Sequence, residues 1–174
     1  MNPSIELRTG RWALLVLPHG SHAELLVAAA RLAQRGPLLI LDGGNRCNAY
    51  TLARAAAGRA DLLRRISLAR AFTCYQMAAL LEGTPEGDCP LFLLDFLATF
   101  YDEAVSALER GRLLSGCLDE LARLSRTRQV AVSACPPAVP GPENLGLLAR
   151  LRAAAGGVWE SDPPLAAPQP WRLF

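Results

Sequence analysis

The segment WALLVLPHGSHAELL, from Trp12 to Leu26, decides how this chain folds. It opens with a continuous apolar run of strand length, WALLVL, which Pro18 and Gly20 end. A strand that is apolar at successive positions is buried on both faces, as in a parallel sheet. Over Ala23–Gln34 the apolar residues then recur at helical spacing. The segment therefore predicts a buried strand, a tight turn and an amphipathic helix.

The same alternation continues along the chain. Strands are predicted at Leu38–Leu41, Arg65–Ala71, Leu91–Asp95 and Val130–Ala134, and helices at Ala49–Ala57, Tyr75–Glu82, Leu113–Ser125 and Leu145–Ala154. Strands that alternate with helices indicate an α/β fold with a mostly parallel central sheet flanked by helices on both faces. We expect a single domain over residues 1–174, with an N-terminal extension at 1–10 and a proline-rich C-terminal tail at 158–174. That tail is expected to be an edge segment or a final strand.

The composition fits a compact protein, since 51% of the residues are apolar and 20% are charged. All 18 basic residues are arginines, so no lysine exists to hold a phosphate or to act as a general base. The formal net charge is only +2, which provides no global basic field for nucleic acid. Such binding would need a local cluster of arginines, and two candidates are Arg64-Arg65 and Arg123, Arg126 and Arg128. Solvated helix ends are the alternative interpretation of both clusters.

The five cysteines are scattered and form no C-x-x-C pair, which favours reduced, mostly buried thiols over a disulfide framework or a zinc site. The N-terminal residues lack a signal pattern, and no apolar run approaches membrane-spanning length. We therefore expect a cytoplasmic protein that does not enter a membrane.

Ligands of α/β sheets bind at the carboxyl ends of the strands, which selects the segments that follow predicted strands. Pro18–Ala23 lies between a buried strand and a helix, which is the position of a phosphate-binding loop. Backbone N–H groups there would hold an anion without any particular side chain. Candidate site residues are therefore Gly20, Ser21, His22 and Ala23 in this loop, Asp95 at the end of its strand, and Asp42 at the edge of the site.

Several of these segments resemble the ATPase core of RecA/RadA-type recombinases. The string ARAFTCYQM (69–77) is similar to the one that follows the third core strand of RadA-type proteins. ILDGGN (40–45) resembles the strand end with the catalytic carboxylate, and LFLLDFLATFYDE (91–103) resembles the Walker B strand. The order of these motifs holds from about Arg11 to Pro137. The resemblance implies a RecA-like P-loop NTPase fold in which Arg70 and Gln76 couple neighbouring subunits or ligands.

The chain departs from that family at the residues that hydrolyse ATP. A lysine and a serine or threonine hold phosphate and magnesium in the family's phosphate loop, whereas His22 and Ala23 stand at those positions. The resemblance places the catalytic carboxylate at Gly44 and the polar γ-phosphate sensor at Ala134-Cys135. Only Asp95 is kept, at the position that holds magnesium through water. These departures predict a degenerate Walker A loop with no cofactor, and ATP with magnesium at Asp95 is the alternative.

The resemblance implies a non-catalytic RecA/RadA paralogue that acts in DNA recombination or repair by docking onto a recombinase or another repair protein. DNA contact and homo-oligomerisation are further expectations, and the recombinase DNA loops would correspond to Phe100–Arg112 and Pro136–Gly157. Two alternatives stay open. One is a nucleotide- or anion-binding sensor, or a weak ATPase, that uses Gly20–Ala23 with Asp95. The other is a stand-alone DNA-binding protein.

The candidate residues also have structural interpretations. His22 in a first helical turn needs no ligand, Asp42 fits a turn residue that accepts backbone N–H bonds, and Asp95 fits a hydrogen-bonding carboxylate. Arg70 and Gln76 fit surface packing at the edge of the sheet. Five aromatic residues are candidates either for a partner-binding surface or for the core: Phe96, Phe100, Tyr101, Trp159 and Trp171.

Overall fold

The computed structural model of this protein describes residues 7–161, apart from the side chains of residues 22–24. A six-stranded sheet in the order β3-β2-β4-β5-β1-β6 forms its centre, and every neighbouring pair of strands is parallel. The predicted α/β architecture is confirmed. The strands are β1 (Ala13–Val16), β2 (Leu38–Asp42), β3 (Ile66–Arg70), β4 (Leu91–Leu94), β5 (Val130–Ala134) and β6 (Gly157–Glu160).

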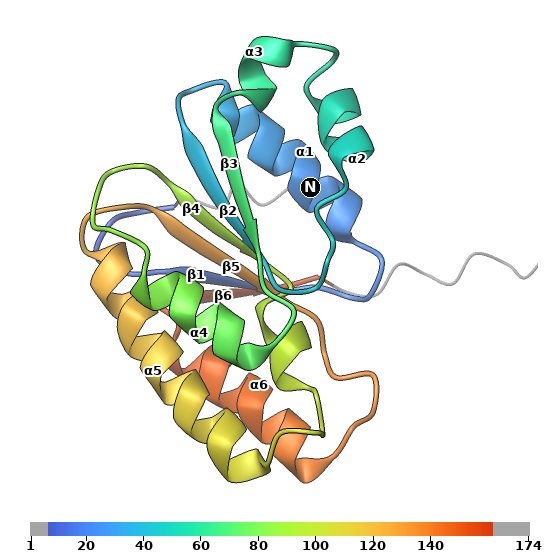
Figure 1. The fold of residues 1–174 in the computed structure, drawn as a ribbon, viewed down its shortest axis with the longest axis vertical. Helices are drawn as coiled ribbons and strands as arrows, with labels where there is room; N and C mark the ends of the chain where they lie inside the picture. Colours follow the sequence, from blue (N-terminus) through green and yellow to red (C-terminus); the bar gives the residue numbers. More distant parts are fainter. Residues whose placement is uncertain (1–6, 162–174) are drawn as a thin grey trace, which may run out of the picture.

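Helices cover both faces of the sheet (Figure 1). One face carries α1 (His22–Ala33), α2 (Ala49–Ala55) and α3 (Ala60–Leu63), and the other carries α4 (Cys74–Glu82), α5 (Ala107–Ser125) and α6 (Pro142–Ala154). Successive side chains of a strand point to opposite faces, so Leu14 and Val16 join the core under α4–α6 while Leu15 joins the core under α1. This two-sided burial is the reason why the strand sequences are continuous apolar runs.

Some helices begin earlier than their apolar pattern predicts. The α5 helix begins at Ala107 rather than at Leu113, because the Ser106 hydroxyl accepts a hydrogen bond from Glu109 N at 3.3 Å and caps the helix. Its first turns carry charged residues and an exposed Leu108, which give no apolar period. The α6 helix begins at Pro142 rather than at Leu145. The short α3 and the 3-10 helix η1 (Phe96–Phe100) were not predicted, since a single turn shows no periodicity.

The C-terminal boundary of the domain also differs from the prediction. Residues 158–160, assigned to the tail, belong to β6, which pairs with β1 at the edge of the sheet. Gly157 permits this strand, because a Cβ at that position would lie 2.8 Å from the ring of Trp159. Trp159 is half-buried. The remainder of the predicted tail, including Trp171, and the first six residues of the predicted extension lie outside the described residues.

Two aromatic candidates for a partner-binding surface belong to the core instead. Phe96 and Phe100 are fully buried in η1, with their ring centroids 5.2 Å apart. The surface interpretation of these two residues is therefore wrong, because η1 turns back beneath α4 and α6 directly after β4. Tyr101, which follows them, is half-buried.

Candidate functional site

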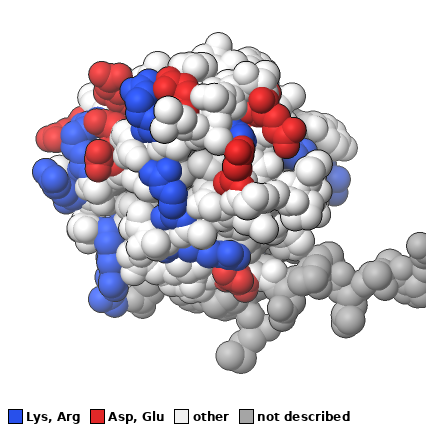
Figure 2. All heavy atoms as spheres, turned by 90° about the horizontal axis from the view of Figure 1, so that it is seen from below, with Lys and Arg blue, Asp and Glu red and all other residues white. Residues whose placement is uncertain are grey.

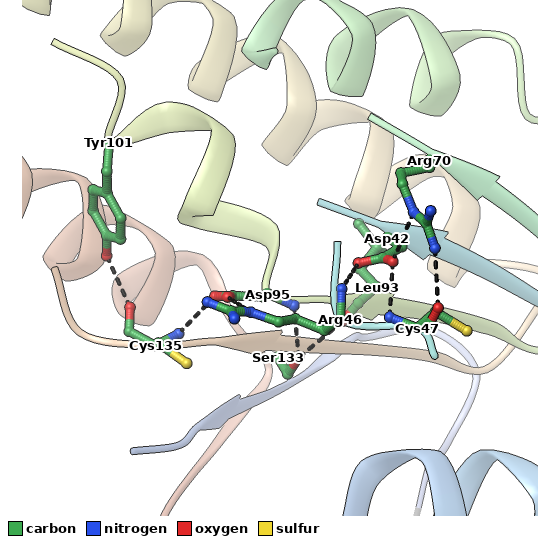
Figure 3. A network of polar contacts seen from close by, with 9 residues as sticks. All are labelled: Asp42, Arg46, Cys47, Arg70, Leu93, Asp95, Tyr101, Ser133 and Cys135. Atoms are coloured by element: carbon green, nitrogen blue, oxygen red, sulfur yellow. Dashed lines mark hydrogen bonds and ion pairs between the residues drawn. The ribbon is translucent and has the colours of Figure 1, made fainter. Parts of the chain in front are cut away.

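The carboxyl ends of β2, β4 and β5 bring together residues that are distant in the sequence (Figure 3). Asp42 ends β2, Asp95 follows β4 and Cys135 follows β5, and these strands are neighbours in the sheet. A cavity of about 320 Å³ opens here, and His19 from the loop after β1 lines it together with Asp95 and Arg46. Of the loop Pro18–Ala23, His19 thus lies at the same hollow as Asp95, whereas Gly20 and Ser21 are not among the residues that line it.

Asp42 holds the loop that follows β2. Its carboxylate is fully buried and accepts hydrogen bonds from the backbone N–H groups of Arg46 and Cys47, both at 2.9 Å. The Arg70 guanidinium donates to the same carboxylate at 3.1 Å and to the Cys47 carbonyl oxygen at 3.0 Å. Asp42 therefore acts as a turn residue, and Arg70 neutralises its buried charge.

Asp95 is also surrounded by hydrogen-bond donors (Figure 3). Its side chain is 3% exposed, with Oδ2 3.1 Å from Arg46 Nε and Oδ1 3.3 Å from Cys135 N. The backbone N–H of Asp95 donates to Ser133 Oγ at 2.9 Å, and that hydroxyl donates to the Leu93 carbonyl oxygen at 3.2 Å. Both carboxylate oxygens are thus engaged by groups of the protein itself.

Gly44, where the resemblance implies a catalytic carboxylate, has no room for any side chain. A Cβ at this position would lie 2.5 Å from Asp95 Oδ2 and 2.7 Å from Asp95 Cβ. Contacts this short do not occur between real atoms without a shift of one partner. With Asp95 in this orientation, residue 44 must therefore be a glycine, and a carboxylate at residue 44 would require Asp95 to move.

Arg46 is the central residue of the site that sequence reasoning missed. It lies four residues after Asp42, yet its guanidinium pairs with Asp95, which is 49 residues away. Its only sequence signal is that it is the one charged residue between Gly43 and Ala53. The sequence does not indicate which neighbouring strand end a charged side chain in such a loop will contact.

The loop between β1 and α1 has the turn that its sequence predicts. Gly20 has a φ of +97°, and Ser21 N donates to the Pro18 carbonyl oxygen at 3.3 Å. Ser21 is the N-cap of α1, but its side chain makes no capping hydrogen bond. The helix begins at His22, and the side chains of His22 and Ala23 lie outside the described residues.

Gln76 lies apart from this hollow and has a local role. Its side-chain oxygen accepts a hydrogen bond from Phe72 N at 2.7 Å, and its own N–H donates to Thr73 Oγ1 at 3.2 Å. This pair is a variant of the capping box at the start of α4, because Gln76 accepts from Phe72, the residue before the N-cap Thr73, and not from Thr73 itself. Because Gln76 is exposed, its effect on the structure is confined to the helix terminus.

The thiol and the phenol near Asp95 stay protonated at neutral pH. Burial, followed by the charge of Asp95 and a hydrogen bond to it, raises the pKa of the Cys135 thiol to about 12. Burial also raises the pKa of Tyr101, whose hydroxyl donates to the Cys135 carbonyl oxygen at 3.1 Å. Since the thiolate is the nucleophilic form, Cys135 is not activated for nucleophilic attack.

The arginine cluster at the end of α5 is mostly structural. Arg123 pairs with Glu120 at 2.6 Å and donates to the Thr84 carbonyl oxygen at 3.0 Å. Arg128 is buried and donates to the Pro85 carbonyl oxygen, so both residues hold the loop after α4. Burial excludes both a phosphate contact and a solvated position for Arg128. Arg123 is half-buried, and Arg126 alone of the three is exposed.

The segments that the resemblance equates with recombinase DNA loops are packed elements here. Residues 100–112 include the start of α5, where the buried Arg110 donates to Asn144 Oδ1 at 2.8 Å and pairs with Glu143 at 2.8 Å. Residues 136–157 are mainly α6. Each segment also contains an exposed loop before its helix, at residues 102–104 and at residues 138–140.

Magnesium and ATP, which the resemblance implies, do not fit the residues at this edge. Arg46 already neutralises Asp95, position 44 has no space for a carboxylate, and residue 23 has no hydroxyl. Apart from residues 22–24, no three His, Cys, Asp or Glu side chains within residues 7–161 are grouped so that they could hold a metal ion. In the same range, no helix is both long enough and apolar enough to cross a lipid bilayer.

Comparison with known proteins identifies the fold. No protein-family model matches the chain, and no curated protein matches it. A crystal structure of the RadB recombinase matches with a TM-score of 0.53 and 14% sequence identity, over 74% of this chain and 62% of that chain. The chain thus spans less than two thirds of the length of that recombinase. At this identity the match shows the fold, which is the RecA-like recombinase fold with its mostly parallel sheet.

Proposed function

We propose that this protein is a recombinase-like protein without ATPase activity that acts in DNA recombination or repair by docking onto a recombinase or another repair protein. Its RecA-like fold, shared with a structure described as a recombinase, supports the process. The main support for the loss of ATPase activity is the ion pair between Asp95 and Arg46 beside Gly44.

The ion pair supports a lost ATPase through its electrostatics. Phosphoryl transfer requires cations that neutralise the charge on the phosphates, and magnesium normally bridges them to a strand-end carboxylate. Here the guanidinium of Arg46 lies against that carboxylate and neutralises it without a metal. Since the chain contains no lysine, the usual cation of a phosphate loop is also absent.

The proposed docking surface is the outer edge of the sheet at β3, together with the start of α4. Leu68, Phe72 and Tyr75 lie there and are 46%, 67% and 49% exposed. We call these three residues the edge surface. Within residues 7–161, β3 pairs only with β2, so its outer backbone groups are open to a further strand. Exposed apolar side chains beside an open strand edge are typical of a protein-binding surface.

The first test is an ATPase assay on the full chain. We expect no magnesium-dependent turnover above the background of a mock purification, and no difference between the wild type and Asp95→Asn. Turnover that depends on magnesium and that Asp95→Asn abolishes would contradict the loss of activity.

The second test measures docking onto the purified recombinase of the native host. We expect Leu68→Ser with Phe72→Ser to lower the affinity at least about tenfold, because truncated hot-spot side chains typically cost more than 1.4 kcal/mol. Leu145→Ser is the control, since Leu145 is 49% exposed on α6, which leads into β6 at the opposite edge of the sheet from β3. Equal losses in both variants, or no binding by the wild type, would exclude this surface as the recombinase site.

An anion sensor is a second candidate, favoured by the cavity that His19 and Arg46 line beside the uncapped start of α1. It predicts that millimolar nucleotide or inorganic phosphate raises the unfolding temperature. It also predicts that His22→Ala removes the effect. Unchanged unfolding temperatures with both ligands would exclude it.

A further inference from the structure

Positive and negative charges are sorted along this chain. Residues 31–70 contain eight arginines and two aspartates, whereas residues 71–122 contain nine carboxylates and two arginines. The net charge of +2 hides this division. A strongly basic surface can therefore exist on a nearly neutral molecule.

Four exposed arginines gather where α1 and α3 end, and we call them the basic surface: Arg31, Arg35, Arg64 and Arg65. Arg31 lies in the last turn of α1, and Arg64 is the C-cap of α3. Arg65 joins the two helix ends, because its Nη1 lies 3.4 Å from the Ala33 carbonyl oxygen and 3.3 Å from the Gln34 carbonyl oxygen. The surface lies on the face of the sheet opposite to α4–α6 (Figure 1).

Within residues 7–161, the charges of the basic surface are compensated only through a Coulombic interaction of Arg65 with Asp61. Among the described residues, none of its four arginines forms an ion pair, and the only exposed carboxylate between residues 31 and 70, Asp61, pairs with Arg59. Some arginines elsewhere pair with carboxylates, as Arg112 does with Glu109 and Arg123 does with Glu120. Figure 2 shows positive and negative side chains next to one another at the end of the molecule where α5 and α6 begin.

The chemistry of the basic surface selects the kind of partner. A protein-binding surface has an apolar centre surrounded by polar groups, as the edge surface has around Phe72. No large exposed apolar side chain lies among residues 31–49 or 51–67 of the described chain. A nucleic-acid backbone needs only spaced cations, and the planar guanidinium suits phosphate oxygens.

We propose that the basic surface binds the phosphate backbone of a nucleic acid without regard to its sequence. At the amino ends of β2 and β3, Leu38 N donates a hydrogen bond to the Arg65 carbonyl oxygen at 2.9 Å. The basic surface therefore lies at the opposite end of these strands from Asp42. It is distinct from the segments that the resemblance equates with recombinase DNA loops. The inference extends the proposed function, because it adds a nucleic-acid contact to docking on a protein.

Salt dependence gives the proposal a magnitude. Each phosphate that an arginine neutralises on duplex DNA adds about −0.9 to the slope of log K against log salt. If all four arginines engage phosphates, the affinity for a duplex falls about a hundredfold between roughly 50 and 200 mM salt.

The experiment measures fluorescence anisotropy of labelled duplex and single-stranded oligonucleotides with the full chain. Arg31→Ala with Arg64→Ala should weaken binding at least about tenfold and halve the salt slope, because two of four phosphate contacts are lost. Arg112→Ala with Arg150→Ala removes the same charge from the segments that the resemblance equates with DNA loops. This control should bind within about twofold of the wild type.

Three results would overturn the proposal. The wild type does not bind the oligonucleotides at low salt, or the control variant loses as much affinity as the Arg31 and Arg64 variant. The third is that a glutamate-rich peptide binds the basic surface as tightly as the oligonucleotides do. The last would identify an acidic protein as the partner. Thermal unfolding checks that both variants are folded. If the variant with Arg31→Ala and Arg64→Ala is unfolded, the variant with Arg31→Gln and Arg64→Gln replaces it. Failure of this proposal can be distinguished from failure of the proposed function. The variant with Leu68→Ser and Phe72→Ser should lose docking but bind nucleic acid as the wild type does.

Discussion

At the residue scale, the conformation of Asp95 links the residues at the carboxyl end of β4. Asp95 lies in the left-handed region with φ of +49° and ψ of 52°, which is uncommon for a residue other than glycine. Such a backbone costs about 1–3 kcal/mol and persists only where surrounding contacts hold it. The ion pair with Arg46 and the bond from Cys135 N provide these contacts. The resulting orientation directs Oδ2 over Gly44.

Gly44→Ala should therefore destabilise the protein by about 1–3 kcal/mol, the usual cost of overpacking. The added methyl would meet Asp95 Oδ2 at 2.5 Å. Urea unfolding monitored by circular dichroism measures the effect. Gly116→Ala is the control, because Gly116 is exposed within α5 with no atom within 4 Å of its added Cβ, and there the change should stabilise by up to about 1 kcal/mol. A Gly44→Ala variant as stable as the wild type would disprove the close packing.

Buried thiols should make stability sensitive to alkaline pH. Burial raises the pKa of Cys117 and of Cys135 to about 12, from an ordinary value of 9.0. Because the folded pKa is the higher one, the thiols contribute fully below pH 9, and their contribution is lost as the pH rises toward 12.

We expect the free energy of unfolding to fall with rising pH above about 9, where the unfolded chain begins to release protons. Cys135→Ala should make this fall shallower, and Cys89→Ala, at a half-buried thiol, serves as the control. Urea titrations at a series of pH values measure both slopes. A pH-independent free energy would show that these thiols also ionise in the folded protein.

At the element scale, a buried arginine ties the first turn of α6 to α5 and η1, in addition to the apolar side chains that α6 contributes to the core. Arg110 projects from α5, is 2% exposed and donates to the Phe100 carbonyl oxygen at 3.1 Å. It also contacts Asn144 and Glu143 in the first turn of α6, both at 2.8 Å. The turn of α5 before Leu113, which the apolar pattern does not predict, contains Arg110 and so provides this contact.

Arg110→Ala should destabilise the protein by about 2–4 kcal/mol, because breaking a buried ion pair typically costs 3–5 kcal/mol and Glu143 is largely in solvent. Hydrogen exchange should show the loss first at the amides of α6. Arg112→Ala removes an exposed arginine from the same helix and should change stability by no more than about 0.5 kcal/mol. Equal exchange of the α6 amides in both variants would contradict the proposed anchor.

At the scale of the whole molecule, three regions differ in chemical character. The carboxyl edge of the sheet contains two buried carboxylates, Asp42 and Asp95, each neutralised by an arginine. The edge surface at β3 is apolar, and the basic surface lies at the amino ends of β2 and β3. Each buried carboxylate at this edge is thus balanced by an arginine of the chain itself.

The unfolding temperature should accordingly be the same in EDTA and in magnesium with ATP. A ligand that bound only the folded state at a hundred times its Kd would stabilise it by about 2.7 kcal/mol, a readily measured shift. Arg46→Ala is the informative variant, because it leaves Asp95 without a cation. Magnesium should raise the unfolding temperature of that variant alone. A rise in the wild type would show that a metal competes with Arg46.

The sequence by itself determined the architecture, because continuous apolar runs and helical periods are local patterns that burial imposes on each strand and helix. It also located the loop after β1 and the strand-end carboxylates, since turn residues follow directly after those runs. Only the tertiary structure decided that Arg46 pairs with Asp95, that Gly44 is closed to a side chain and that α1 and α3 gather their arginines. Those outcomes depend on which strands become neighbours and in what register, and a local pattern holds no information on distances between distant segments.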